Sequence, residues 1–191
     1  MINNLIDYFE QHISLDEVEK QFIRENIPVK AIKKNHLLLK EGETSTEFYF
    51  IIKGAIRLFY KINLEEKTAF FYFENKFVSS YESFTKQTPT KHNLQTIEDS
   101  TIALISFETA YKLLELFPKF DFLARMMMEE ELIVCQEIIA SFVTQNAEKR
   151  YQKLVNENNN LIQRIPQYQL ATYLGVTPET LSRIRKRIFS K

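Results

Sequence analysis

The spacing of apolar residues changes twice along the chain and divides it into three stretches. Residues 2–11 predict a short amphipathic helix, and Ser14 followed by Glu17 predicts a capping box that opens a second helix. From Val29 onward, short apolar and aromatic segments separated by turn signals occur at 36–39, 48–52, 55–61, 68–73, 76–79, 93–97 and 101–105. Many short strands at such intervals are typical of an antiparallel sandwich or barrel.

Helical spacing returns after the last predicted strand. Ser106 is a candidate cap for a helix over 107–116, and 118–145 predicts one long helix because no proline or glycine follows its first residue. A near-heptad stripe on the long helix places a candidate dimer seam at Leu123, Met127, Glu130, Val134 and Ile138. We expect one face of this helix to pack on the strand domain and another on a second copy of the chain. A helix buried within its own domain is the alternative.

The C-terminal stretch predicts a helix-turn-helix. A shorter helix is expected from Ala147 to Val155, then a polar loop at 156–160 and two compact helices. Counted from Gln167, the motif requires apolar residues at positions 4, 8, 10, 15 and 18, a small residue at 5 and glycine at 9. All seven positions match, with Leu170, Leu174, Val176, Leu181, Ile184, Ala171 and Gly175.

These requirements have physical causes. Ala171 must be small because the second helix crosses close above it, and Gly175 lies where the turn needs a positive φ. Thr177 is the expected cap of the second helix, and Pro178 suits its first position. At about 100° per residue, the face opposite the inward apolar residues carries basic and hydrogen-bonding side chains.

This outward face predicts contacts with double-stranded DNA. Arginine binds guanine bidentately and a carboxylate accepts from cytosine, so the candidate base contacts are Glu179, Thr180 and Arg183. The candidate phosphate contacts are Thr177, Lys186, Arg187 and Gln167. The alternative is an ordinary helical hairpin in which Glu179 and Arg183 form an i, i+4 ion pair.

The distribution of charge agrees with a polyanionic partner. The chain has 25 basic and 25 acidic residues, so its net charge is zero. Residues 161–191 hold six basic residues and one acidic residue, a net charge of +5, which leaves −5 on the remaining 160 residues. A basic end on an acidic body is typical of nucleic-acid binding.

The sequence lacks the patterns typical of metalloproteins, enzymes, secreted proteins and membrane proteins. Cys135 is the only cysteine and the three histidines show no metal-ligand spacing, so we expect neither a metal nor a cofactor. No nucleophile–base pair or phosphate loop occurs, and an enzyme is therefore not expected. The chain has no signal-peptide pattern and no apolar run of the roughly 20 residues that cross a bilayer. A cytoplasmic protein without a membrane partner is expected.

The segment Thr177–Arg183, which reads Thr-Pro-Glu-Thr-Leu-Ser-Arg, resembles the recognition helix of the Crp/Fnr family of bacterial transcription regulators. Residues 40–43 and 50–57 look like the glycine turns of that family's cyclic-nucleotide-binding β-roll, so the resemblance covers nearly the whole chain. It implies that Glu179 and Arg183 read bases.

The resemblance also implies an α+β fold in three parts. These are an N-terminal double-stranded β-helix (jelly-roll) sensor domain at 1–117, a dimerisation helix at 118–145 and a winged-helix-like helix-turn-helix domain at 146–191. The family's terminal β-hairpin is not expected after the recognition helix. Pro178 replaces the arginine that precedes the family's glutamate, so the base sequence read should differ.

The family's phosphate-binding cassette is degenerate here. The cassette needs Phe-Gly-Glu and, about ten residues later, an arginine, because the glycine amide approaches the phosphate and the arginine neutralises it. In this chain a tyrosine replaces the glycine and no arginine follows, which leaves Tyr81, Glu82, Lys91 and His92 as a candidate effector pocket. A response to cyclic AMP is not expected, and the many aromatic residues favour a filled interior or a small apolar effector.

The prediction is therefore a homodimeric, sequence-specific transcription regulator that reads a pseudo-palindromic DNA site through its 178–187 helix. RNA polymerase and a small-molecule effector are further candidate partners. The alternative is a small-molecule-binding signalling module, cyclic nucleotides included, with vestigial DNA binding.

Overall fold

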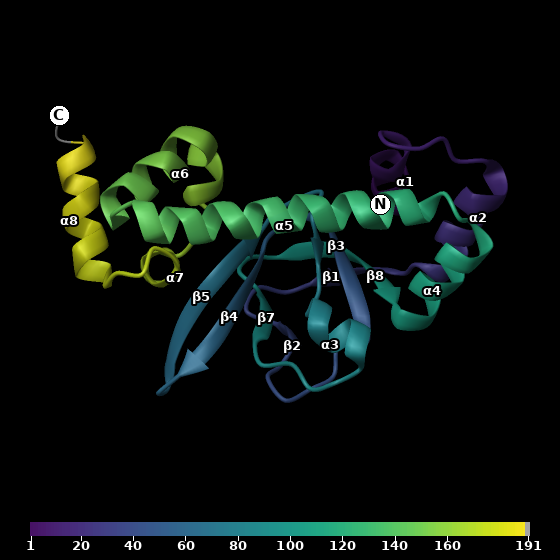
Figure 1. Cartoon of the computed structure of the whole chain (residues 1–191), viewed down its shortest axis with the longest axis horizontal. Helices are drawn as coiled ribbons and strands as arrows, with labels where there is room; N and C mark the ends of the chain where they lie inside the picture. Colours follow the sequence, from purple (N-terminus) through teal and green to yellow (C-terminus); the bar gives the residue numbers. More distant parts are fainter. Residues whose placement is uncertain (190–191) are drawn as a thin grey trace. The chain divides into compact units, whose positions relative to one another are not determined.

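The computed structural model describes residues 1–189, without the side chains of 158–161 and 189. The chain forms two compact units (Figure 1). One unit contains Met1–Leu58 and Phe71–Glu130, and the other contains Phe59–Phe70 and the chain from Glu131 onward. This division differs from the predicted boundaries, because the end of one hairpin groups with the C-terminal helices and the long helix contributes to both units.

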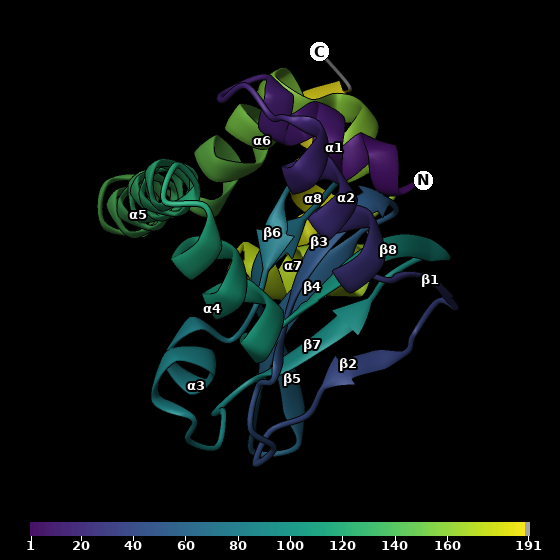
Figure 2. The same ribbon diagram turned by 90° about the vertical axis from the view of Figure 1, so that its right-hand side faces the viewer.

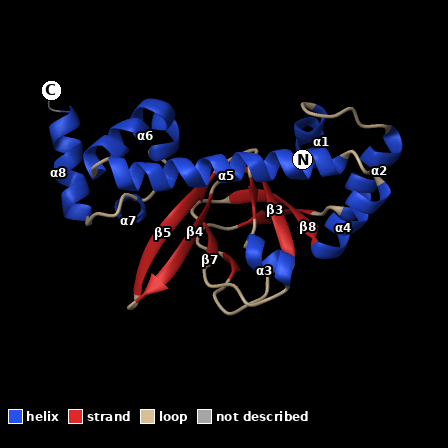
Figure 3. Ribbon diagram, viewed as in Figure 1, coloured by secondary structure: helices blue, strands red, loops and turns tan. Residues whose placement is uncertain are grey.

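The strands form two four-stranded sheets (Figure 3). The first sheet has the order β1-β8-β3-β6, and the second has the order β2-β7-β4-β5. Their bounds are β1 Val29–Ile32, β2 Leu37–Leu39, β3 Glu47–Lys53, β4 Ile56–Ile62, β5 Glu65–Tyr72, β6 Phe77–Val78, β7 Asn93–Thr96 and β8 Ser100–Ser106. The predicted jelly-roll is confirmed, although β1 and the short helix α3 (Tyr81–Lys86) have no counterpart among the predicted elements.

The sequence of strand β3 is a continuous apolar run because both faces of the strand are buried. Tyr49 pairs with Leu104 and Val78, and its hydroxyl donates to the carbonyl of Leu38 in the second sheet at 3.1 Å. The next residue, Phe50, alternates to the opposite face and joins the core beneath the helices. Both faces of the strand are therefore covered, so alternation between apolar and polar residues is lost.

Four helices cover that side of the first sheet (Figure 2). They are α1 Ile2–Glu10, α2 Glu17–Asn26, α4 Phe107–Leu116 and the beginning of α5 Phe120–Thr144. Their buried side chains form one cluster with the sheet, including Leu5, Ile23, Phe50, Ala103, Leu113, Phe120 and Leu123. As predicted, Ser106 caps α4, accepting from the amide of Thr109 at 3.0 Å.

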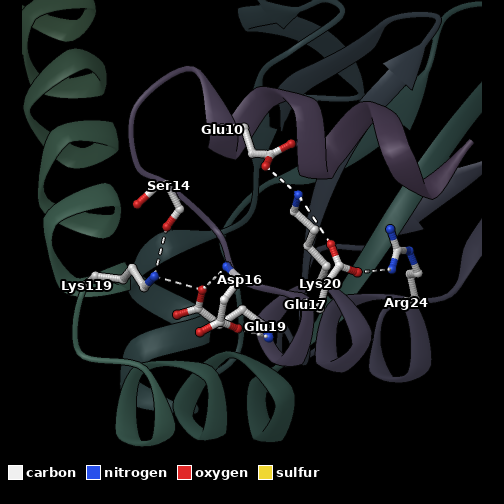
Figure 4. A network of polar contacts seen from close by, with 8 residues as sticks. All are labelled: Glu10, Ser14, Asp16, Glu17, Glu19, Lys20, Arg24 and Lys119. Carbon is white, nitrogen blue, oxygen red and sulfur yellow. Dashed lines mark hydrogen bonds and ion pairs between the residues drawn. The ribbon is translucent and has the colours of Figure 1, made fainter.

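The cap of α2 lies two residues beyond the predicted one (Figure 4). Asp16 accepts from the amide of Glu19 at 2.9 Å, and Glu19 accepts from the amide of Asp16 at 2.8 Å. Glu19 is buried and also pairs with Lys119 at 2.7 Å, while Lys119 donates to the carbonyl of Ser14 at 2.8 Å. Ser14 therefore anchors the start of α5 through its main chain, and the predicted Ser14–Glu17 capping box is wrong.

The second unit contains the remaining helices. They are the later part of α5, α6 Ala147–Ile162, α7 Gln167–Tyr173 and α8 Pro178–Phe189. The polar loop predicted at 156–160 is wrong, because α6 continues through it. Asparagine costs a helix well under about 1 kcal/mol per residue, and the segment contains no glycine or proline that would end the helix. Among the described residues, no strand follows β8.

Candidate nucleic-acid interface

Helices α7 and α8 form the predicted helix-turn-helix. Ala171 is fully buried, and its carbonyl accepts from the amide of Val176 at 3.0 Å across the turn. Gly175 has φ +70°, the left-handed conformation for which the motif needs glycine. Leu181 and Ile184 are buried on the inward side of α8. The structural prediction for the hairpin is confirmed.

The N-terminus of α8 is capped as expected. The hydroxyl of Thr177 accepts from the amide of Thr180 at 3.3 Å, and Pro178 is the first helical residue. Glu179 follows with a pKa below its ordinary value, because its own backbone amide, the Thr177 hydroxyl and the charge of Arg183 all favour the carboxylate. Glu179 is therefore an ionised acceptor at neutral pH, as a contact to the amino group of cytosine requires.

The predicted DNA contacts lie mostly on the exposed side of α8. Glu179, Arg183, Lys186 and Arg187 are exposed, whereas Thr180 is half-buried. Arg183 donates from Nη2 to the Thr180 hydroxyl at 3.1 Å, which orients the guanidinium along the helix. Two further predicted contacts, Thr177 and Gln167, are exposed at the first turns of α8 and α7.

Arg187 has a partner within the chain. Its Nη1 donates to Glu148 Oε2 on α6 at 2.8 Å, and the two side chains are 63% and 30% exposed. A phosphate would have to displace this carboxylate before Arg187 could contact it.

Arg150 is a structural residue of the hairpin that the sequence did not single out. Its guanidinium donates to the carbonyl of Gln145 at 2.6 Å and to the carbonyl of Leu174 at 2.7 Å. The same group lies 4.2 Å from the ring centroid of Phe142. Burial lowers the pKa of Arg150. One side chain from α6 thus joins the end of α5 to the turn of the helix-turn-helix, a connection between distant residues for which the sequence carries no local signal.

The four residues of the candidate effector pocket are mainly at the surface. Tyr81 is 54% exposed, and Glu82 pairs with Lys86 at 3.1 Å on α3. The pKa of Glu82 is lowered by Lys86 and, less strongly, by Lys91. His92 is half-buried, and burial lowers its pKa.

Neutral hydroxyl groups hold the same region together. Ser80 and Thr90 are buried and their hydroxyls are 2.8 Å apart. Ser83 accepts from the amide of Ser45 at 2.8 Å. The segments that align with the family's phosphate cassette are thus held together by serine and threonine hydroxyls.

The five residues of the predicted dimer seam differ in their burial along α5. Leu123 is 1% exposed and belongs to the core of the first unit, so it is not available to a partner. Met127 and Ile138 are half-buried, and Glu130 pairs with Lys76 at 3.3 Å. Val134, at 40% exposure, is the most accessible apolar residue of the five. Leu123 therefore packs on its own chain, whereas the seam along the rest of the stripe stays a prediction.

The described residues were compared with the requirements of a metal site and of a membrane-spanning helix. Within residues 1–189, no group of three or more histidine, cysteine or acidic residues is arranged to hold a metal ion. No described helix has both the length and the apolar character needed to cross a bilayer.

Several solved structures share this architecture. Residues 29–116 match the family model of the cyclic nucleotide-binding domain. The c-di-GMP responsive global regulator CLP from Xanthomonas campestris has a TM-score of 0.74, 14% identity and 92% coverage of both chains. FixK2 from Bradyrhizobium japonicum has a TM-score of 0.74 and 16% identity, covering 86% of this chain and 85% of its own.

A putative transcriptional regulator of the Crp/Fnr family from Eubacterium rectale is also similar, with a TM-score of 0.75 and 16% identity. The similarity covers 96% of this chain and 88% of that one. No curated protein matches the chain in sequence. The chain therefore carries a cyclic nucleotide-binding domain within the fold of the Crp/Fnr regulators, and the predicted resemblance is confirmed.

Proposed function

We propose that the protein is a homodimeric, sequence-specific DNA-binding transcription regulator. Two copies of α8 enter successive major grooves about 34 Å apart and read a pseudo-palindromic site. RNA polymerase is a further candidate partner, and the protein acts in the cytoplasm.

The observation that carries this proposal is the outer surface of α8. A capped helix presents an ionised glutamate and an exposed arginine one turn apart, at Glu179 and Arg183. Carboxylate and guanidinium groups discriminate cytosine and guanine in the major groove. Lys186 lies on the same exposed surface and supplies positive charge for phosphates. In an ordinary helical hairpin, Glu179 and Arg183 would form an ion pair with each other. Here Arg183 instead donates a hydrogen bond to the hydroxyl of Thr180.

An exposed apolar stripe on α5 supports the homodimer. Phe122, Leu132, Ile139 and Val143 are 47%, 58%, 64% and 80% exposed. Their successive separations of 10, 7 and 4 residues are sums of the three- and four-residue steps of a heptad. At about 100° per residue, this stripe lies nearly opposite the buried one. A parallel copy of α5 is a suitable cover, because it presents an identical stripe in the same register.

Arg183→Ala is expected to weaken binding to the selected operator by about 1–3 kcal/mol, or roughly 5- to 150-fold, and to relax one base position in each half-site. The operator is obtained first by selecting bound fragments of genomic DNA, and fluorescence anisotropy at fixed salt then gives the affinity. Arg24→Ala removes an arginine from α2 and is the matched control, which should bind like the original chain. Unchanged affinity and base preference in Arg183→Ala would exclude α8 as the reading helix.

Leu132→Glu is expected to separate the dimer, because it places a charge in the exposed α5 stripe. The mass measured by light scattering should fall from twice 22.7 kDa to 22.7 kDa. Leu64→Glu is the control, since Leu64 is fully exposed at the end of the β4–β5 hairpin. Val134→Glu tests the other face of α5. If Val134→Glu dissociates the dimer and Leu132→Glu does not, the dimer seam is the stripe predicted from the sequence and not the exposed one.

The second candidate function, a signalling module that binds a cyclic nucleotide, is favoured by the β-roll itself. Against it, Glu82 pairs with Lys86, and neutral hydroxyls join the cassette segments. Calorimetry with cyclic AMP and cyclic GMP distinguishes the two functions, since tight binding requires an anion site that these residues do not form.

A further inference from the structure

A hydrogen bond within α8 fixes the direction of the Arg183 side chain. Arg183 Nη2 donates to the hydroxyl of Thr180 at 3.1 Å. Thr180 precedes Arg183 by three residues, so the two side chains are neighbours on one face of the helix. The bond therefore holds the guanidinium toward the first turn of α8.

Thr180 is itself held in one orientation. Its amide donates to the hydroxyl of Thr177 at 3.3 Å, and the two hydroxyl oxygens are 3.2 Å apart. Threonine is branched at Cβ, so rotation about its χ1 is restricted, and this side chain is half-buried. A short side chain that is fixed in this way is suited to orient a longer neighbour.

The bond acts on a side chain that would otherwise be mobile. Arg183 is exposed, and an exposed arginine has many rotamers to lose when it binds. Ordering one such side chain weakens an association by roughly 2- to 13-fold. The N-terminal residues of a recognition helix are the ones that contact base edges. A guanidinium that already lies near that end avoids part of this cost.

The acceptor is a neutral hydroxyl, which leaves the arginine able to bind DNA. A guanidinium has five N–H donors, so the bond to Thr180 leaves enough of them for a bidentate contact with O6 and N7 of guanine. Arg187 differs, because it donates to the carboxylate of Glu148, a charged partner that a phosphate has to displace.

We propose that Thr180 is a positioning residue for Arg183, in place of the direct base contact predicted from the sequence. Its hydroxyl holds the guanidinium near the start of α8, where a guanine would be recognised. This inference rests on the proposed DNA binding and adds to it the residue that sets how well one base is discriminated.

Two substitutions separate the Thr180 hydroxyl from the rest of the side chain. Thr180→Val removes the acceptor at nearly constant volume and keeps the amide that Thr177 caps. It should weaken binding to the selected operator by roughly 2- to 13-fold and relax the same base position as Arg183→Ala does. Thr180→Ser keeps the hydroxyl and should bind like the original chain. Thr144→Val, the control, removes a hydroxyl from the exposed end of α5 and should change neither property.

A double-mutant cycle distinguishes positioning from direct contact. If Thr180 acts through Arg183, adding Thr180→Val to Arg183→Ala causes no further loss of affinity. The affinities come from fluorescence anisotropy at fixed salt, and the base preference comes from operators in which each position is varied in turn. A further loss of the full size, or relaxation at a different base position, would show that Thr180 itself contacts DNA and would overturn the proposal.

A measurement without DNA separates this proposal from the proposed function. In the free protein, NMR relaxation of Arg183 Nε should give a lower order parameter in Thr180→Val than in Thr180→Ser or the original chain. Equal order parameters in all three would overturn the positioning role, even where Arg183→Ala weakens DNA binding. If the order parameter falls but Arg183→Ala leaves DNA binding unchanged, the proposed function fails and the proposal fails with it, although the bond itself is present.

Discussion

Gly54→Ala is expected to destabilise the protein by about 3 kcal/mol or more, from positive-φ strain and overpacking together. Gly54 has φ +106°, and a Cβ added there would lie 2.2 Å from Ser100 Oγ and 2.7 Å from Ser100 Cα. Rotation of the Ser100 side chain relieves only part of the clash, because the Cα of Ser100 is also too close. Ser100 is the first residue of β8, which pairs with both β1 and β3. Relief of the clash therefore requires the centre of the first sheet to shift.

Chemical denaturation monitored by circular dichroism measures this loss. Gly42→Ala is a matched control, because Gly42 also has a positive φ, +88°, but an added Cβ meets nothing within 4 Å. The control should lose only the strain of an alanine in that conformation, about 1 kcal/mol. Equal losses in the two variants would show that the approach of Ser100 does not constrain Gly54.

Arg150→Met is expected to destabilise the second unit by about 2–3 kcal/mol. The variant keeps much of the aliphatic volume of the arginine but leaves the carbonyls of Gln145 and Leu174 without their charged donor. One hydrogen bond to a charged group contributes about 1.5–3 kcal/mol to the free energy of unfolding. Arg150→Lys should recover little of the loss, because an ammonium cannot reproduce two diverging donors and a planar contact with Phe142.

Hydrogen exchange of the amides in α7 and α8 reports this effect locally. Lys149→Met is the control, since Lys149 is the exposed neighbour of Arg150 on α6. Faster exchange in the hairpin of Arg150→Met, with unchanged exchange in β3 and β8, is the expected pattern. Uniform exchange rates across all variants would contradict the role of Arg150 in holding the turn.

The local signals in the sequence predicted the helix-turn-helix well. Ala171, Gly175 and Thr177 each satisfy a requirement set within a few residues, so spacing alone identified the turn, the cap and the inward face of α8. The strands of the β-roll other than β1 were also found, because most breaks between them carry glycine, proline or asparagine.

Features that depend on distant residues were missed or misassigned. The α5 stripe at Leu123 and Ile138 has the period of a dimer seam, but periodicity does not reveal which partner covers it. Arg150 looks like any basic residue on a helix until the carbonyl of Leu174 lies beside it.

The pairing of Arg187 with Glu148 means that the protein supplies one of its own counterions. On free DNA the phosphates are neutralised by condensed salt cations, and binding is driven partly by their release. In the proposed complex with DNA, Arg187 would move to a phosphate, so a cation would leave the DNA while Glu148 would attract one from solution. The net number of ions released would then be smaller than the count of basic residues on α8 suggests, and the proposed DNA binding would depend less on ionic strength than that count implies.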